Sequence, residues 1–437
     1  MRKFNNSSIY RLFNLSDEKA MGRSCMLASS IAENILSWLT AGAFYTGFLM
    51  VAGIDVVKIG IISFVPYIAN CFAIFAPSIL ERFAKRRKLL FVMQMTYYVL
   101  NLFATTIMPF IVKGDVARTV CFAVLIFAAN IIQALINGGF TAWHINFIPH
   151  EIRAEYFSTS SMISSFIGIG TGLISSLLAD SLSASPYADT IIYILRFFAV
   201  GVAVFDVFML TKPKEYPYKR SDTKVRLTDV FTKPLKHRRF RISIIVVALW
   251  RFVVALSSSY LDFYLLNNVG TSYTFIFILN ICYPCTMLLL LKKAQHLINR
   301  YGWFRVFGIR GLIYAIPSFM FSLVTANNYI WMLAIVRLSQ HVIGVALNTT
   351  TANLELVHVP DEDSTNYLSF GTVLLNIATF LGIMLSTWFV GAFPDIRITI
   401  AGFEFGNLQL LMWAESVGSA VVAAIALRLR NILDTRD

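Results

Sequence analysis

Apolar residues fill twelve long runs of the chain, and short polar or charged segments separate them. The runs cover approximately residues 27–52, 58–80, 89–112, 117–142, 158–181, 188–211, 242–267, 272–291, 304–325, 328–352, 368–394 and 407–429. Each run is near the ~20 residues that a helix needs to cross a bilayer. The runs lack the period-two alternation of barrel strands, and only helices or closed barrels satisfy the backbone in lipid. The pattern therefore predicts an all-α membrane protein with twelve transmembrane helices.

The chain carries two copies of one pattern of charged residues between apolar runs. Arg82 and Arg300 lie 218 positions apart, and each follows the second apolar run of its copy. Farther along, residues 148–158 and 359–369 resemble each other at an offset of 211. Repeats of this kind are typical of duplicated membrane proteins. We therefore expect two pseudo-symmetric six-helix bundles.

A polar and basic segment separates the two copies. We expect an N-terminal half at 1–211, a cytoplasmic linker at 212–241 and a C-terminal half at 242–437. The linker is too polar to cross the membrane, and its few apolar residues, at 225–231, are enough for a short surface helix.

Composition and charge support an integral membrane protein. The chain is 57% hydrophobic and 14% charged, whereas soluble domains carry about 25% charged residues. Its net charge of +13 is unevenly placed, because the linker alone holds 11 of the 37 Lys and Arg residues. By the positive-inside rule, the linker and both termini are cytoplasmic, in the plasma membrane. We expect the linker to contact lipid headgroups, and no nucleic acid to be a partner.

Other features exclude several classes of protein. More than twenty polar residues precede the first run, so we expect that run to be an uncleaved anchor and no signal peptide. The five cysteines lie in or beside apolar runs, which favours packing over a metal site. The sequence contains no G-x-x-x-x-G-K-[ST] loop and no H-x-x-x-H pair, so we expect neither an enzyme nor a cofactor.

Residues after the second run resemble the most recognisable motif of the major facilitator superfamily, G-x-x-x-D-R-x-G-R-R/K. The matching residues are Glu81, Arg82, Lys85 and Arg86, with Pro77 and Ala84 in place of the two glycines. The second copy keeps Arg300 and Gly302 but has Asn299 in place of the acid. Together with the plan of six helices, linker and six helices, this identifies the chain as similar to that superfamily.

The resemblance implies a secondary active transporter that moves a small solute by alternating access, with its site between the halves near the middle of the membrane. It also implies that the first, fourth, seventh and tenth helices line the central cavity. A proton is the driving ion that the family suggests, and a monomer is the family's usual state.

Four side chains inside the first and seventh runs are candidates for the substrate or ion pathway: Glu33, Ser37, Arg251 and Asp262. A charge inside a span costs about 2.5–3.5 kcal/mol unless it faces protein or water. Glu33 and Arg251 occupy equivalent places, 218 positions apart. Two interpretations stay open: a charge pair that binds substrate or releases a proton, or structural and snorkelling side chains.

Polar stripes on the fourth and tenth runs are the second group of pathway candidates. The residues are Asn130, Gln133, Asn137 and His144 in the first half, and Arg337, Gln340, His341 and Asn348 in the second. Interhelical hydrogen bonds could use the same groups. Because the stripes recur in both halves, a hydrated path is the favoured interpretation.

Charged loop residues are candidates for a cytoplasmic gate. These are Glu81, Arg82, Arg153 and Arg300. We expect Glu81 or its neighbours to pair with Arg153, and Arg300 or Arg305 to pair with the acidic run 361–363 in the second half. Three further ionisable residues in the sixth and twelfth runs are expected to be structural pairs or to snorkel to the interface: Arg196, Asp206 and Glu415.

Several alternatives remain open at this stage. Uptake of a sugar or other nutrient and efflux of an amphipathic drug are equally compatible with the aromatic-rich composition. A transporter-like membrane sensor or assembly partner without flux is the alternative from another class.

Overall fold

The computed structural model describes residues 12–13, 17–80, 82–83, 85–215, 227–360, 364–400 and 402–434. Within them, eleven helical segments are long and apolar enough to cross a membrane. The pair α2 (Glu18–Thr40) and α3 (Gly42–Val51), bent by 49°, adds a twelfth if it is one span. This confirms the predicted all-α membrane fold.

The chain forms two compact units, the first made of Met1–Ile54 with Phe72–Lys224 and the second of Asp55–Cys71 with Val225–Asp437. Besides α2 and α3, the α-helices of the first unit are α5 (Ala76–Leu80), α6 (Arg87–Tyr98), α7 (Thr105–Ile111), α8 (Asp115–His144), α9 (Arg153–Ser181) and α10 (Ala188–Leu210). In this unit α2 packs against α9 and α10, and α6 packs against α8.

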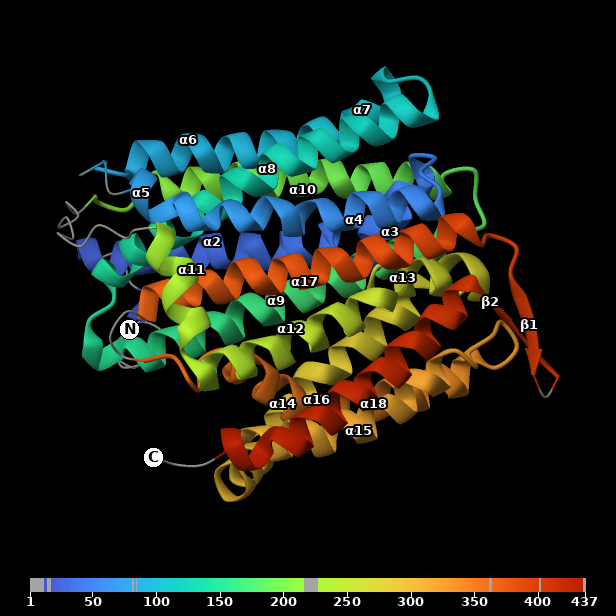
Figure 1. Ribbon diagram of the computed structural model, residues 1–437. Helices are drawn as coiled ribbons and strands as arrows, with labels where there is room; N and C mark the ends of the chain where they lie inside the picture. The colour runs from blue at the N-terminus through green and yellow to red at the C-terminus, as the bar shows by residue number, and fades with distance from the viewer. Residues whose placement is uncertain are drawn as a thin grey trace. The chain divides into compact units, whose positions relative to one another are not determined.

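The second unit contains the remaining helices and a hairpin. They are α4 (Val56–Asn70), α11 (Leu227–Lys236), α12 (Arg238–Ser258), α13 (Leu261–Phe263), α14 (Tyr273–Tyr301), α15 (Trp303–Phe321), α16 (Tyr329–Leu354), α17 (Ser364–Ala392), α18 (Asn407–Leu433), β1 (Arg397–Ile400) and β2 (Phe403–Gly406). Within this unit α15 runs beside α18 (Figure 1). Gly308 and Gly311 of α15 face Ala423 of α18, so the missing side chains let the two backbones approach.

The α4 segment groups with the second unit, although the predicted first half included it. It packs along α17, where Gly60 faces the hydroxyl groups of Tyr260 and Thr387. Tyr260 in turn donates a hydrogen bond to Thr387 over 2.9 Å. The sequence repeat reports which segments were duplicated, whereas side-chain packing decides which segments form a unit.

Two π-helical turns interrupt the helical spans. η2 (Val99–Ala104) joins α6 to α7, and η5 (Tyr264–Val269) follows α13. A π turn adds a residue to the helical turn and is frequent at functional sites.

A short antiparallel hairpin, β1 with β2, lies between α17 and α18 (Figure 1). The register pairs Arg397 with Gly406 and Ile400 with Phe403. Gly402 has a φ of +82°, which the tight turn requires and which glycine adopts at little cost. Strands of four residues are too short for their alternation to be distinguished from a loop in the sequence, and we did not predict them.

Candidate functional site

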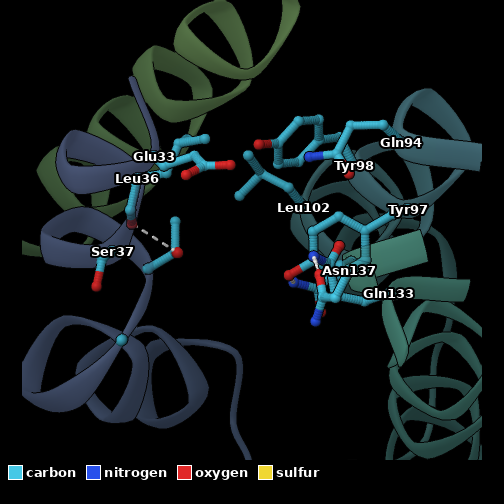
Figure 2. Close-up of a pocket in the computed structure, with 12 residues that line it drawn as sticks. Glu33, Leu36, Ser37, Gln94, Tyr97, Tyr98, Leu102, Gln133 and Asn137 are labelled. Carbon is cyan, nitrogen blue, oxygen red and sulfur yellow. Dashed lines mark hydrogen bonds between the residues drawn. The ribbon is translucent and has the colours of Figure 1, made fainter. Parts of the chain in front are cut away.

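A polar cavity of about 480 Å³ opens inside the first unit. Side chains of α2, the α6–η2 span and α8 surround it (Figure 2). Its lining residues are Glu33, Leu36, Ser37, Thr40, Ala41, Gln94, Tyr97, Tyr98, Asn101, Leu102, Gln133 and Asn137. Most of these residues carry a hydrogen-bonding group, which is unusual inside apolar spans because such groups are costly in lipid. We call this space the first cavity.

The predicted candidates Glu33, Ser37, Gln133 and Asn137 all line the first cavity. Figure 2 shows Glu33 directed across the cavity toward Tyr98, while Ser37 lies one turn farther along α2. Gln133 and Asn137 are also one turn apart on α8, and the amide of Gln133 donates to Asn137 over 2.5 Å. Helical spacing therefore brings the two pairs to one space.

Two carboxamide oxygens of the first cavity have no hydrogen-bond partner in the described part of the chain. They belong to Gln94, which is 3% exposed, and Gln133. A buried acceptor without a partner costs about 1–3 kcal/mol. Both residues line the cavity, but protein atoms cover the two oxygens, so a side-chain rotation has to expose them before a solute with hydroxyl or amine donors can satisfy them.

The third span supplies four polar lining residues that the sequence analysis did not propose: Gln94, Tyr97, Tyr98 and Asn101. Their spacing in an apolar run was a usable signal, because positions 94, 97, 98 and 101 fall on one face of a helix. Asn101 lies in η2, and its amide donates to the Tyr97 hydroxyl over 3.2 Å. The π turn therefore leaves this polar face intact.

A second cavity, of about 450 Å³, lies inside the second unit. It is lined by Tyr67, Trp250, Arg251, Val254, Ala255, Ser258, Asn348, Thr351, Ala352 and Thr379. Two predicted candidates, Arg251 and Asn348, are among them. Arg251 forms an ion pair with Glu355 at 3.4 Å, and the Asn348 amide donates to the Tyr283 hydroxyl over 3.0 Å. A charge pair of Arg251 with Glu33 is one of the two interpretations left open by the sequence, and both stay open.

Four other candidates of the second half lie outside the residues that line the second cavity. Arg337 donates to Gln340 over 3.4 Å and lies 5.0 Å from the centre of the Phe321 ring. His341 contacts the backbone oxygen of Leu279 at 2.9 Å. Asp262, on α13, interacts electrostatically with Arg337.

The remaining two residues of the polar stripe on α8 contact other groups of the first unit and do not line its cavity. Asn130 donates to the carbonyl of Ile126 over 2.8 Å, one turn back on its own helix. His144 packs beside Phe140 and Trp143, with ring centres 6.0 and 6.1 Å away. Its Nε2 is buried and has no hydrogen-bond partner among the described residues.

The proposed gate residues are only partly described. Glu81 and the run 361–363 lie outside the described residues, so the pairs predicted for them stay predictions. Arg82 lies in the turn after α5, and its backbone N–H donates to Ile79 over 3.3 Å. Arg153 begins α9, and the Arg300 guanidinium lies 5.2 Å from the Tyr301 ring centre.

Three ionisable residues of the sixth and twelfth spans are buried, which agrees with the structural alternative of the prediction and not with snorkelling to the interface. Arg196 is 2% exposed and donates to the hydroxyl groups of Thr105 and Thr106 over 3.0 and 2.9 Å. Asp206 is fully buried, and Glu415 accepts a hydrogen bond from Ser257. Hydroxyl donors on neighbouring helices compensate these groups inside the protein.

No group of three or more potential metal ligands occurs in the ranges that the structure describes. The polar groups of both cavities are instead amides, hydroxyls and single charges. These groups suit hydrogen bonding to an organic solute or exchange of a proton.

Comparison with known proteins identifies the family. The family model described as Major Facilitator Superfamily matches residues 25–383. A search of curated protein sequences finds no significant match.

Solved structures with a similar fold include three transporters. They are the nucleoside transporter NupG (TM-score 0.64, 14% identity, 93% of this chain and 98% of that chain), a D-xylose-proton symporter (TM-score 0.63, 12% identity, 94% and 97%) and the POT family transporter PepTSo (TM-score 0.67, 13% identity, 95% and 99%). At these identities the likeness concerns the fold. The family match and this fold agree with the duplicated twelve-span plan. The chain therefore belongs to the Major Facilitator Superfamily, and it is a membrane transporter and not an enzyme.

Proposed function

We propose that the protein is a proton-coupled secondary transporter of a small polar solute, working by alternating access as a monomer in the plasma membrane. Glu33 takes up the coupling proton in the first cavity, and Gln94, Gln133 and Asn137 bind the solute. Both termini and the linker face the cytoplasm.

The polar lining of the first cavity carries this proposal. A volume of about 480 Å³ falls in the range of roughly 300–1,000 Å³ typical of small-molecule sites. Unpaired amide oxygens of Gln94 and Gln133 favour a solute rich in hydroxyl or amine donors. This lining suits a sugar-like or nucleoside-like nutrient better than an amphipathic drug, because such a drug is bound mainly by apolar contacts.

Glu33 supports proton coupling by its position. It is the carboxylate that lines the first cavity, and its side chain is exposed to that space. A proton and a solute that bind in one cavity can influence each other's affinity, and such linkage is the basis of coupled transport. One solved structure of similar fold is a D-xylose-proton symporter, and proton coupling of this kind is what we propose here.

The test is flux in proteoliposomes that contain the full-length protein and a pH-sensitive dye, screened with sugars, nucleosides, organic acids and cationic drugs. We expect a polar solute to move together with protons. Glu33→Gln should abolish proton movement, while Glu404→Gln should leave it unchanged, because Glu404 is an exposed hairpin residue 3.4 Å from Arg397.

Three other outcomes of this experiment would contradict parts of the proposal. Binding of solutes without any flux would favour a sensor. Export of cationic drugs without movement of polar solutes would contradict the proposed substrate class. Normal proton movement in Glu33→Gln would reject Glu33 as the coupling residue.

A further inference from the structure

Asp206 is a fully buried acid one turn before the end of α10. Each of its carboxylate oxygens accepts a hydrogen bond from a hydroxyl group of a neighbouring helix. Ser29 of α2 donates to Oδ1 over 2.5 Å, and Tyr98 of α6 donates to Oδ2 over 2.7 Å. Asp206 itself is not among the residues that line the cavity.

No cation pairs with Asp206 among the residues that the structure describes, since its partners there are the hydroxyl groups of Ser29 and Tyr98 and the amide of Gln94. Arg196 lies on the same helix but donates to Thr105 and Thr106. An unpaired carboxylate in an apolar interior is strongly unfavourable, and such a group tends to bind a proton instead.

Tyr98 connects Asp206 to the cavity. Its ring lines the first cavity, and its hydroxyl donates its only proton to Asp206. The oxygen of that hydroxyl can also accept a hydrogen bond. Figure 2 shows Glu33 directed toward Tyr98 from the opposite wall, and Glu33 and Asp206 act on each other electrostatically.

The titratable groups that face Asp206 are therefore Glu33 from α2 and Tyr98 from α6. α3 also packs against α10, but its Tyr45 interacts with Arg196 instead. The charged residues of α9 occupy its first and last turns, and the sequences of η2 and α7 contain no titratable residue.

We propose that Asp206 is a second proton-binding site, which exchanges a proton with Glu33 through Tyr98. In the exchange, the proton of the Glu33 carboxyl bonds to the Tyr98 oxygen while the original Tyr98 proton bonds to the Asp206 carboxylate. One O–H bond forms and one breaks at Tyr98, which is neutral before and after. The inference rests on the proposed function in one respect, namely that Glu33 takes a proton from the cavity.

The second unit supplies a matched control. Glu415 of α18 is buried and accepts a hydrogen bond from Ser257 of α12, and it interacts electrostatically with Tyr314. This arrangement resembles that of Asp206, but Tyr314 is not among the residues that line the second cavity. Glu415 is therefore buried like Asp206 and also interacts electrostatically with Arg337, but no tyrosine connects it to a cavity.

The test is infrared difference spectroscopy of the purified full-length protein after a pH jump, which detects protonation of individual carboxyl groups. We expect one signal that Asp206→Asn removes and another that Glu33→Gln removes. Glu415→Gln should leave both signals in place. In Tyr98→Phe, the Asp206 signal should develop about 100-fold more slowly, since a positioned proton-transfer group contributes roughly that factor or more.

Tyr97→Phe is the control for Tyr98→Phe, because Tyr97 lines the same cavity but accepts from Asn101. If the Asp206 signal did not change with pH, or if both tyrosine variants behaved as wild type, the second proton site or its connection would be rejected. Should Asp206→Asn fail to fold, the Tyr98→Phe comparison still decides the question.

These outcomes are distinct from a failure of the proposed function. Absence of solute flux in the wild type, with a titrating Asp206 signal that depends on Tyr98, would overturn the transport proposal and leave the proton site standing. Coupled flux with an Asp206 signal that never changes would do the reverse.

Discussion

Gln94 and Asn130 are both carboxamides in apolar spans, yet they are satisfied differently. Asn130 donates to the backbone of its own helix, at Ile126, over 2.8 Å. Gln94 is buried at the cavity wall with its oxygen unpaired. At the scale of single residues, an amide in a span can bond to its own helix, as Asn130 does, or lie at a cavity wall, as Gln94 does. Which of the two occurs depends on what the side chain faces.

Replacing Gln94 with leucine should weaken binding of the transported solute about tenfold, equivalent to ~1.4 kcal/mol, because one hydrogen bond to the solute is lost. The measurement is the solute's Kd for the purified protein. Asn376→Leu is the control, since Asn376 donates to its own helix at Thr372. Equal weakening in both variants would argue against Gln94 as a binding residue.

His358 lies in the loop after α16, outside the spans. Its Nδ1 is 2.6 Å from the Ser243 hydroxyl, and its ring stacks on Phe304 with centres 6.0 Å apart. Burial lowers the pKa of His358, and the positive charges of Arg239 and His237 act in the same direction, opposed by Asp434. The folded protein therefore binds a proton at His358 less readily than the unfolded chain does.

This shift predicts a pH dependence of stability. The contribution of neutral His358 is complete above its unfolded pKa of about 6.5 and is lost as the pH falls below that value. His358→Gln should reduce the decrease in Tm between about pH 7 and pH 5 in thermal unfolding of the detergent-solubilised protein. His296→Gln, at an exposed position, should retain the wild-type decrease, and identical curves for all three proteins would contradict the prediction.

At the scale of helices, glycines determine how closely α12 and α17 approach. A Cβ at Gly382 of α17 would collide with the Phe252 backbone oxygen and with Ala255, both on α12. At Gly371 of the same helix, the nearest atom to an added Cβ is 3.5 Å away, in the flexible Ile244 side chain. One helix therefore contains both a glycine that packing requires and one that it does not.

Gly382→Ala should destabilise the protein by about 1–3 kcal/mol, the usual cost of overpacking. Gly371→Ala should be neutral or stabilise it by up to ~1 kcal/mol, because alanine favours the helix. Thermal unfolding followed by size-exclusion chromatography compares the two variants. A Gly382→Ala protein as stable as wild type would mean that the two helices can separate without cost.

The third span shows what the sequence pattern contained and what it left unresolved at this scale. Tyr97, Tyr98 and Gln94 fall on one helical face, so a polar face could have been recognised from spacing. The same spacing does not reveal that Tyr98 donates inward to Asp206 while its ring borders the cavity. Those directions depend on where α2 and α10 lie.

At the scale of the whole molecule, the placement of basic residues predicts the topology. The linker holds 11 of the 37 Lys and Arg residues. Green fluorescent protein fused to the C-terminus or inserted in the linker should fluoresce, because we expect both to be cytoplasmic. Alkaline phosphatase inserted at Gly402 in the hairpin should be active, and the opposite pattern would reverse the orientation.

The alternation of apolar and polar runs in the sequence is enough by itself to predict a helical membrane protein of two related halves. Run length matches the bilayer, and the backbone allows few structures in lipid. The runs also placed Glu33 with Ser37 on one helical face and Gln133 with Asn137 on another, because helical spacing aligns residues one turn apart.

Tertiary structure alone decided which polar groups are satisfied by neighbours and which are open to a solute. The burial of Asp206 and Arg196 and the grouping of α4 with the second unit depend on contacts between segments distant in sequence. Hydropathy reflects the free energy of placing a side chain in the membrane. The neighbours that compensate this cost are determined by how the helices pack.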